Sequence, residues 1–143
     1  MATMQALQMV AWQAPPELRT VAIPEPGPGE VLIKVGGAGL CHSDLHIMAA
    51  PGEGIGWSLP FTLGHENAGW VEKLGDGATG FAVGDAVIVY GPWGCGQCRN
   101  CKAGMDNYCE TSVGATQGGG LGRNGGMAPY LLVPSTRHLV ALG

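Results

Sequence analysis

The sequence has little charge. Charged residues make up 13% of its 143 positions, against about 25% in an average soluble domain. Lysine and arginine together number 7, and they form no basic stripe. Because binding to phosphate backbones requires clustered cations, this composition argues against nucleic acid as a partner.

Long apolar runs are also missing. No stretch approaches the roughly 18 apolar residues that a membrane-spanning helix requires, and residues 1–10 lack the basic start and apolar core of a signal peptide. We therefore expect a cytoplasmic protein without a membrane partner. Thiols stay reduced in that compartment, so the five cysteines point to metal binding or catalysis rather than to disulfides.

Helical periodicity is scarce, whereas glycine is abundant at 26 residues. Short β-branched segments separated by glycine and proline predict a mainly β fold, a small and partly open barrel with few short helices. The expected strands are 4–10, 18–23, 31–35, 68–74, 85–90, 127–133 and 138–142. A short helix is expected at 43–48, and 91–126 is expected to form an irregular lobe.

Four cysteines within that lobe have the spacing C-x2-C-x2-C-x7-C: Cys95, Cys98, Cys101 and Cys109. The segment around them has little apolar material to pack, and a structural zinc ion bound by four thiolates would hold it together. Two disulfides or an iron–sulfur cluster are the alternatives. Neighbouring C-x2-C cysteines are awkward disulfide partners, and the x7 gap suits a ferredoxin-type run poorly. Trp93, just before the lobe, is either a core anchor or a pocket wall.

The segment from Cys41 to Glu66 carries more polar chemistry than any other part of the chain. A thiolate at Cys41 and an imidazole at His65 can bind one zinc ion from two sides. Because only these two ligands are firm, the pattern predicts half of a catalytic metal site.

These motifs together resemble the N-terminal catalytic domain of the zinc-dependent alcohol dehydrogenases of the medium-chain dehydrogenase/reductase superfamily. The matching pieces occur in family order: residues 26–31 (PGPGEV), 39–44 (GLCHSD), 64–69 (GHENAG), Gly75, Ala78, Gly84-Asp85 and the four-cysteine lobe. The resemblance covers nearly all of residues 1–143 and implies one GroES-like domain. It also implies that the Rossmann cofactor domain of such enzymes is absent from this chain.

For the metal sites, the resemblance implies that Cys41 and His65 are ligands of the catalytic zinc. Glu66 lies beside that zinc and binds it transiently, so it counts among both the catalytic residues and the ligands. Asp44 accepts a hydrogen bond from the His65 ring and fixes its tautomer. A further ligand is expected from the missing domain.

For the reaction, the resemblance implies that Ser43 takes the proton of the substrate hydroxyl and that His46 passes it towards solvent. It places His42 at a position that contacts the cofactor pyrophosphate, and Trp57 in a loop that lines the substrate cleft. Solvated histidines and plain loop packing are the simpler explanations of His42, His46 and Trp57.

The activity implied is oxidation of an alcohol to an aldehyde or ketone, with hydride transfer to NAD or NADP. The string at 120–125 (GLGRNG) matches G-x-G-x-x-G, but a strand rather than a helix is expected after it, so it is rejected as a dinucleotide site. We therefore expect the chain alone to be inactive. We also expect exposed apolar surface that promotes self-association or binds a cofactor-domain partner. The alternative function is a stand-alone GroES-like zinc-binding module without catalysis.

Overall fold

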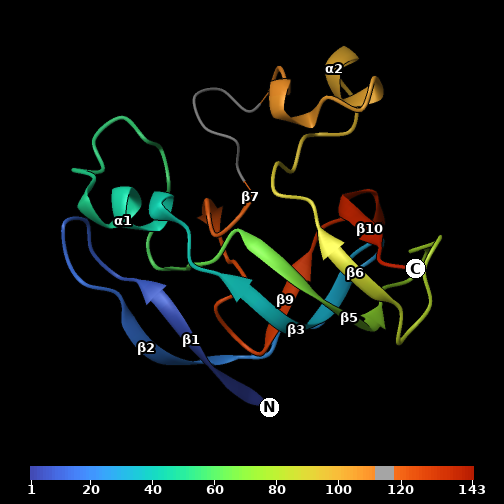
Figure 1. The fold of residues 1–143 in the computed structure, drawn as a ribbon, viewed down its shortest axis with the longest axis horizontal. Helices are drawn as coiled ribbons and strands as arrows, with labels where there is room; N and C mark the ends of the chain where they lie inside the picture. The colour runs from blue at the N-terminus through green and yellow to red at the C-terminus, as the bar shows by residue number, and fades with distance from the viewer. Residues whose placement is uncertain (112–117) are drawn as a thin grey trace.

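The computed structural model describes residues 1–111 and 118–143 (Figure 1). Within these ranges the fold is mainly β with few short helices, so the predicted fold class is confirmed. The strands are β1 Thr3–Met9, β2 Glu17–Ala22, β3 Val31–Gly39, β4 Phe61–Thr62, β5 Glu66–Leu74, β6 Ala86–Val89, β7 Gly118–Gly119, β8 Gly122–Arg123, β9 Tyr130–Val133 and β10 Leu139–Ala141. The helices are α1 His42–Ala49, α2 Arg99–Lys102 and the 3₁₀ turns η1 Asp106–Tyr108 and η2 Thr136–His138.

Two antiparallel sheets form the body of the described chain. One has the order β2-β1-β4, and the other has the order β10-β6-β5-β3-β9. The longer strands β3 and β5 pair along most of their length, with register shifts at Leu32/Ile33 and Val35/Gly37. Such irregularities bend a strand, so they let the five-stranded sheet curl.

The main core lies on the inner face of the curled sheet. Its buried members are largely β-branched, as expected for alternating strands: Val31, Ile33, Val71, Val87, Val89, Trp93, Leu131, Val133 and Leu139. A second cluster lies between β1, β4 and helix α1. It is built from Met9, Phe61 and Leu63, and Ile47 and Met48 of the helix pack against it.

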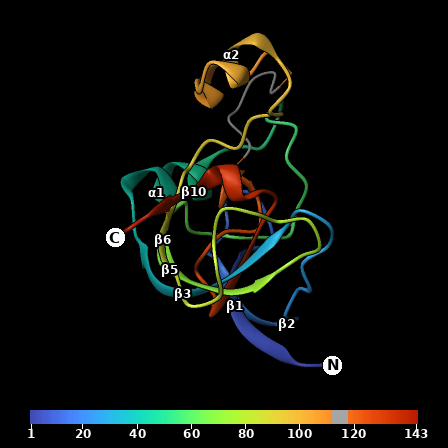
Figure 2. The same ribbon diagram turned by 90° about the vertical axis from the view of Figure 1, so that its right-hand side faces the viewer.

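The lobe that follows β6 projects from the sheets and carries α2 and η1 (Figures 1 and 2). Residues 112–117 of the predicted lobe lie outside the described residues. The G-x-G-x-x-G string falls on the short strands β7 and β8, and the next regular element is β9. No described helix is long and apolar enough to cross a membrane.

Candidate metal centres

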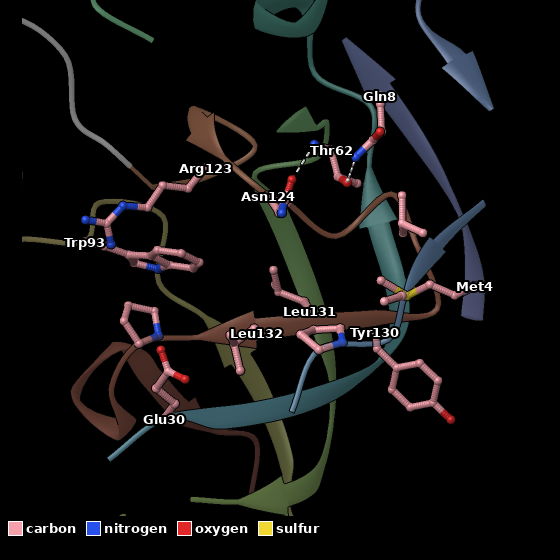
Figure 3. Close-up of a pocket in the computed structure, with 15 residues that line it drawn as sticks. Met4, Gln8, Glu30, Thr62, Trp93, Arg123, Asn124, Tyr130, Leu131 and Leu132 are labelled. Atoms are coloured by element: carbon pink, nitrogen blue, oxygen red, sulfur yellow. Dashed lines mark hydrogen bonds between the residues drawn. The ribbon is translucent and has the colours of Figure 1, made fainter. Parts of the chain in front are cut away.

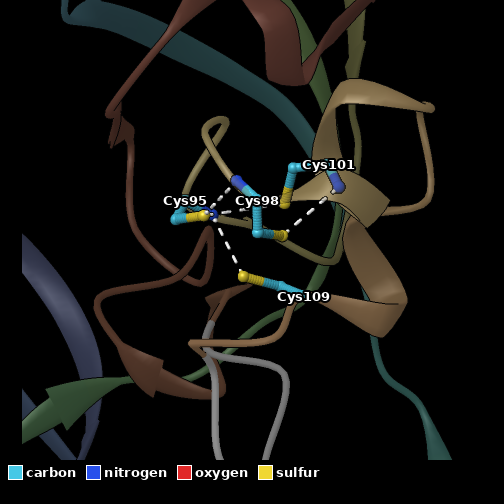
Figure 4. Close-up of side chains that lie close together, drawn as sticks. All are labelled: Cys95, Cys98, Cys101 and Cys109. Atoms are coloured by element: carbon cyan, nitrogen blue, oxygen red, sulfur yellow. Dashed lines mark hydrogen bonds between the residues drawn. The ribbon is translucent and has the colours of Figure 1, made fainter.

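The four cysteines of the lobe converge on one point, although they come from a loop, α2 and the end of η1 (Figure 4). Their sulfur atoms all lie within 4.8 Å of one another, and Cys95 Sγ is 4.0 Å from Cys101 Sγ. Sulfur atoms around a tetrahedral zinc at 2.3 Å are separated by about 3.8 Å. None of the four cysteines forms a disulfide in the described structure. The donor set therefore fits a structural zinc ion.

Backbone amides surround these sulfur atoms and favour the thiolate form. The N–H groups of Gln97 and Cys98 both donate to Cys95 Sγ, at 3.4 and 3.3 Å, and they lower the pKa of Cys95. Cys101 is buried, and this burial raises the pKa of its thiol to about 12. A bound cation would offset the cost of a thiolate at such a position.

An ion pair between the buried carboxylate of Asp106 and the partly exposed guanidinium of Arg137 connects the lobe to the barrel. Arg137, in η2, donates to both carboxylate oxygens of Asp106, at 2.5 and 2.9 Å, and also to the carbonyl oxygen of Cys101 at 3.2 Å. Asp106 accepts another hydrogen bond from Gly94 N–H at 2.9 Å. Burial alone would raise the pKa of Asp106, but these hydrogen bonds and the charge of Arg137 lower it.

Sequence pattern gives no signal for this pair, because its members are 31 residues apart in the chain. The only local signal is Gly94, where a Cβ atom would lie 2.4 Å from Cys101 Sγ and 2.8 Å from Asp106 Oδ2. His138 continues the contact into the core. It is buried and stacks on Trp93 with ring centroids 5.9 Å apart, and burial lowers its pKa to about 4.

The second metal group forms where two neighbouring strands meet. Gly39, at the end of β3, pairs with Glu66 at the start of β5. Cys41 follows the first strand and His65 precedes the second, so the antiparallel register brings them together. Ligand atoms of Cys41, His65 and Glu66 lie within 4.8 Å of one another. Thiolate, imidazole and carboxylate are all zinc ligands, so this donor set also fits zinc.

Helix α1 holds Asp44 behind this group. Asp44 is completely buried, and its Oδ2 accepts a hydrogen bond from Cys41 N–H at 2.9 Å, which fixes the first turn of the helix. Its other oxygen, Oδ1, lies 3.4 Å from His65 Nδ1, and these two buried atoms have no other hydrogen-bond partner in the described structure. This arrangement favours a proton on Nδ1 and leaves Nε2 as the nitrogen with a free lone pair.

Asp44→Asn is expected to weaken zinc binding at Cys41/His65 by about 10- to 100-fold without unfolding the domain. The amide oxygen can still accept from Cys41 N–H. The amide nitrogen would face His65 Nδ1, favour a proton on Nε2 and so remove the lone pair. Competition with a chelating zinc indicator measures the affinity, and Asp76→Asn on the exposed surface is the matched control. Unchanged zinc affinity in Asp44→Asn would contradict this account.

The predicted relay residues all lie on or beside the first turn of α1. Ser43 is exposed, as are His42 and His46. His42 Nδ1 and His46 Nε2 are 3.1 Å apart. The structure thus brings the two histidines into contact with each other. Among the described residues, it shows no hydrogen bond of the Ser43 side chain.

The two tryptophans predicted to line the substrate pocket lie in different places. Trp57 rests against Phe61 and Trp12, with ring centroids 5.7 and 6.5 Å apart, and its Nε1 is buried without a hydrogen-bond partner among the described residues. Trp93 is a core residue that is 5% exposed, and its Nε1 donates to the carbonyl oxygen of Tyr90 at 2.8 Å.

Trp93 also lines a cavity of about 320 Å³ between the two sheets (Figure 3). The lining is mostly apolar, with Gln8, Thr62, Asn124 and Arg123 as its main polar members. It contains none of the residues of either metal group. The cavity that Trp93 lines is therefore separate from both metal groups.

Known proteins resemble this chain over most of its length. Residues 27–142 match the family model described as alcohol dehydrogenase GroES-like domain. The chain is 40% identical to D-arabinose 1-dehydrogenase (NADP(+)) of Saccharolobus solfataricus, over 96% of this chain and 38% of that protein. It is 38% identical to an NAD-dependent alcohol dehydrogenase of Sulfurisphaera tokodaii, over 97% of this chain and 41% of that protein.

Among solved structures, a cobalt- and zinc-bound thermostable alcohol dehydrogenase from Pyrobaculum aerophilum superimposes with a TM-score of 0.83 at 35% identity. The match covers 98% of this chain and 41% of that one. The chain thus spans about two fifths of the length of these relatives.

Proposed function

This chain belongs to the zinc-containing alcohol dehydrogenase family, whose GroES-like domain it comprises, and from that premise we propose that it supplies the metal-binding catalytic part of an NAD(P)-dependent dehydrogenase. The substrate class is an alcohol that is oxidised to an aldehyde or ketone. The observation that carries the proposal is the convergence of Cys41, His65 and Glu66 on one point, supported by buried Asp44.

The chemistry follows from the residues of this group. A zinc ion bound there supplies a Lewis acid, which lowers the pKa of an alcohol hydroxyl. Cys41 and His65 hold the ion, while Asp44 keeps the His65 ring in the tautomer that can bind it. Glu66 is exposed and offers a carboxylate that can enter or leave the coordination shell.

Proton removal is assigned to α1. We propose that Ser43 accepts the proton of the alcohol hydroxyl and passes it to His46, from which it reaches solvent. The 3.1 Å contact between the two histidine rings gives this proton a second exposed imidazole, that of His42. We also propose that His42 contacts the cofactor pyrophosphate, because a ring N–H at a helix start can donate to an anion.

The hydride acceptor is proposed to be NAD or NADP bound by a further domain, as in the much longer relatives. Support comes from the outer face of the five-stranded sheet. Trp70, Ile88, Val140 and Leu142 expose between 43% and 54% of their surface there, and Ile88 pairs directly with Val140. Exposed apolar patches of this kind mark contact surfaces, so we assign this face to a cofactor-domain partner or to self-association.

A chimera tests the proposal. The chain is fused to the remaining three fifths of the Sulfurisphaera tokodaii relative, and alcohol-dependent formation of NADH is followed by absorbance. Activity is expected in the chimera, and none in the chimera carrying Cys41→Ala or in the isolated chain. A chimera that binds NAD and two zinc ions but oxidises no alcohol would favour the stand-alone zinc-binding module instead.

A further inference from the structure

The two histidines of α1 form a pair that the metal groups above do not use. His42 and His46 are four residues apart and therefore lie one above the other on the same helix face. Both are exposed, and their ring centroids are 4.7 Å apart at an interplanar angle of 66°. Neither belongs to the group formed by Cys41, His65 and Glu66.

The nitrogen atoms of this pair have the separation of two ligands on one metal ion. His42 Nδ1 and His46 Nε2 are 3.1 Å apart. Two nitrogens bound at 2.0–2.1 Å lie about 2.9 Å apart at a right angle and about 3.3 Å apart in a tetrahedron. The observed distance falls between these values. It is also the distance of a hydrogen bond between the two rings, so a cation that binds both nitrogens replaces the proton between them.

The same spacing is used by zinc sites in which two histidines at i and i+4 on one helix face bind a single ion. Imidazole nitrogen suits Cu²⁺, Ni²⁺ and Zn²⁺, and two rings on a preformed helix form a chelate. In the described structure the pair contacts no carboxylate or ammonium group that would compete for its nitrogens.

We propose that His42 and His46 form a separate, solvent-facing chelating site for a divalent transition-metal ion. Its occupancy would also withdraw the two imidazoles that the proposed function assigns to proton transfer and cofactor contact. That last consequence depends on the proposed function, whereas the chelating site itself does not.

Titration of the zinc-loaded, untagged chain with Ni²⁺, followed by isothermal titration calorimetry, tests the site. His42→Asn and His46→Asn are each expected to weaken Ni²⁺ binding by about 10- to 100-fold, because either change leaves a single monodentate imidazole. Wild type should take up one Ni²⁺ ion at the pair, and the double variant, which keeps neither imidazole, should show no Ni²⁺ binding there. Two independent surface histidines would instead give two weak sites, of which each single variant removes one and leaves the affinity of the other unchanged, and that result would overturn the proposal.

Two further measurements distinguish the histidine pair from the Cys41/His65 group. Cys41→Ser should leave Ni²⁺ binding at the histidine pair unchanged, since the thiolate is not a ligand there. If Ni²⁺ binding disappears in Cys41→Ser, the ion occupies the Cys41/His65 group and the proposed pair is wrong. In the active chimera, Ni²⁺ should inhibit the wild-type enzyme at concentrations that do not further lower the rate of the His46→Asn variant. If the pair binds Ni²⁺ in a chimera that has no dehydrogenase activity, the proposed function is contradicted and the proposed chelating site is not.

Discussion

Cys101→Ser is expected to remove one of two zinc ions from the purified chain and to lower its free energy of unfolding by about 3 kcal/mol or more, equivalent to a melting temperature about 10 °C lower. The described residues of the lobe form no core cluster of their own. Cys101 is the most buried of the four cysteines, 2% exposed. Removing one ligand opens the tetrahedral site, so the binding free energy of the ion no longer stabilises the lobe.

Elemental analysis by mass spectrometry measures the zinc content, and circular dichroism measures the melting temperature. Cys41→Ser is the matched control, because it changes the same type of residue in the other metal group. It should also remove one zinc ion, but with little change in stability, since Cys41 is half-buried and the sheet around it is held by strand pairing. Equal losses of stability in the two variants would contradict the assignment of one structural and one catalytic ion.

A metal group can be predicted from the sequence when its ligands lie close together in the chain. Cys95, Cys98 and Cys101 repeat at intervals of three, so a loop and a short helix necessarily bring them together. The pairing of Cys41 with His65 spans a longer separation. The donor types predict that pairing and the family resemblance supports it. The register of β3 on β5, which brings the two residues together, depends on strand irregularities that the composition does not reveal.

The side-chain contacts around the metal ligands are harder to predict from the sequence than the ligands themselves. His138 lies in a segment expected to be strand, and sequence pattern gives no reason to bury an imidazole there. Its burial follows from its stacking on Trp93, a contact between distant segments. The segment became the turn η2 followed by β10, and that turn also places Arg137 over the lobe. Long-range side-chain pairs of this kind are decided by tertiary packing, which periodicity does not encode.

The ion pair between Arg137 and Asp106 should therefore be a major determinant of how the lobe is held. Arg137→Met leaves the buried carboxylate of Asp106 without its cation. It is expected to cost about 1.5–3 kcal/mol of stability, because the guanidinium is partly exposed to solvent, whereas Asp106→Asn is expected to cost less. In the double variant Asp106→Asn/Arg137→Met no charge is left unpaired. Its loss should therefore be smaller than the sum of the two single losses, which a double-mutant cycle by urea unfolding measures.

The pH dependence gives this prediction a second readout. The native pKa of Asp106 lies below its ordinary value of 3.8. The stability that its carboxylate contributes is therefore fully present above that ordinary value, and it is lost only as the pH falls through the lower native pKa. The difference in stability between wild type and Asp106→Asn should consequently be constant from about pH 5 to pH 8. A difference that already shrinks between pH 7 and pH 5 would show that another group, with His138 as the nearest candidate at 3.8 Å, carries the electrostatic contribution.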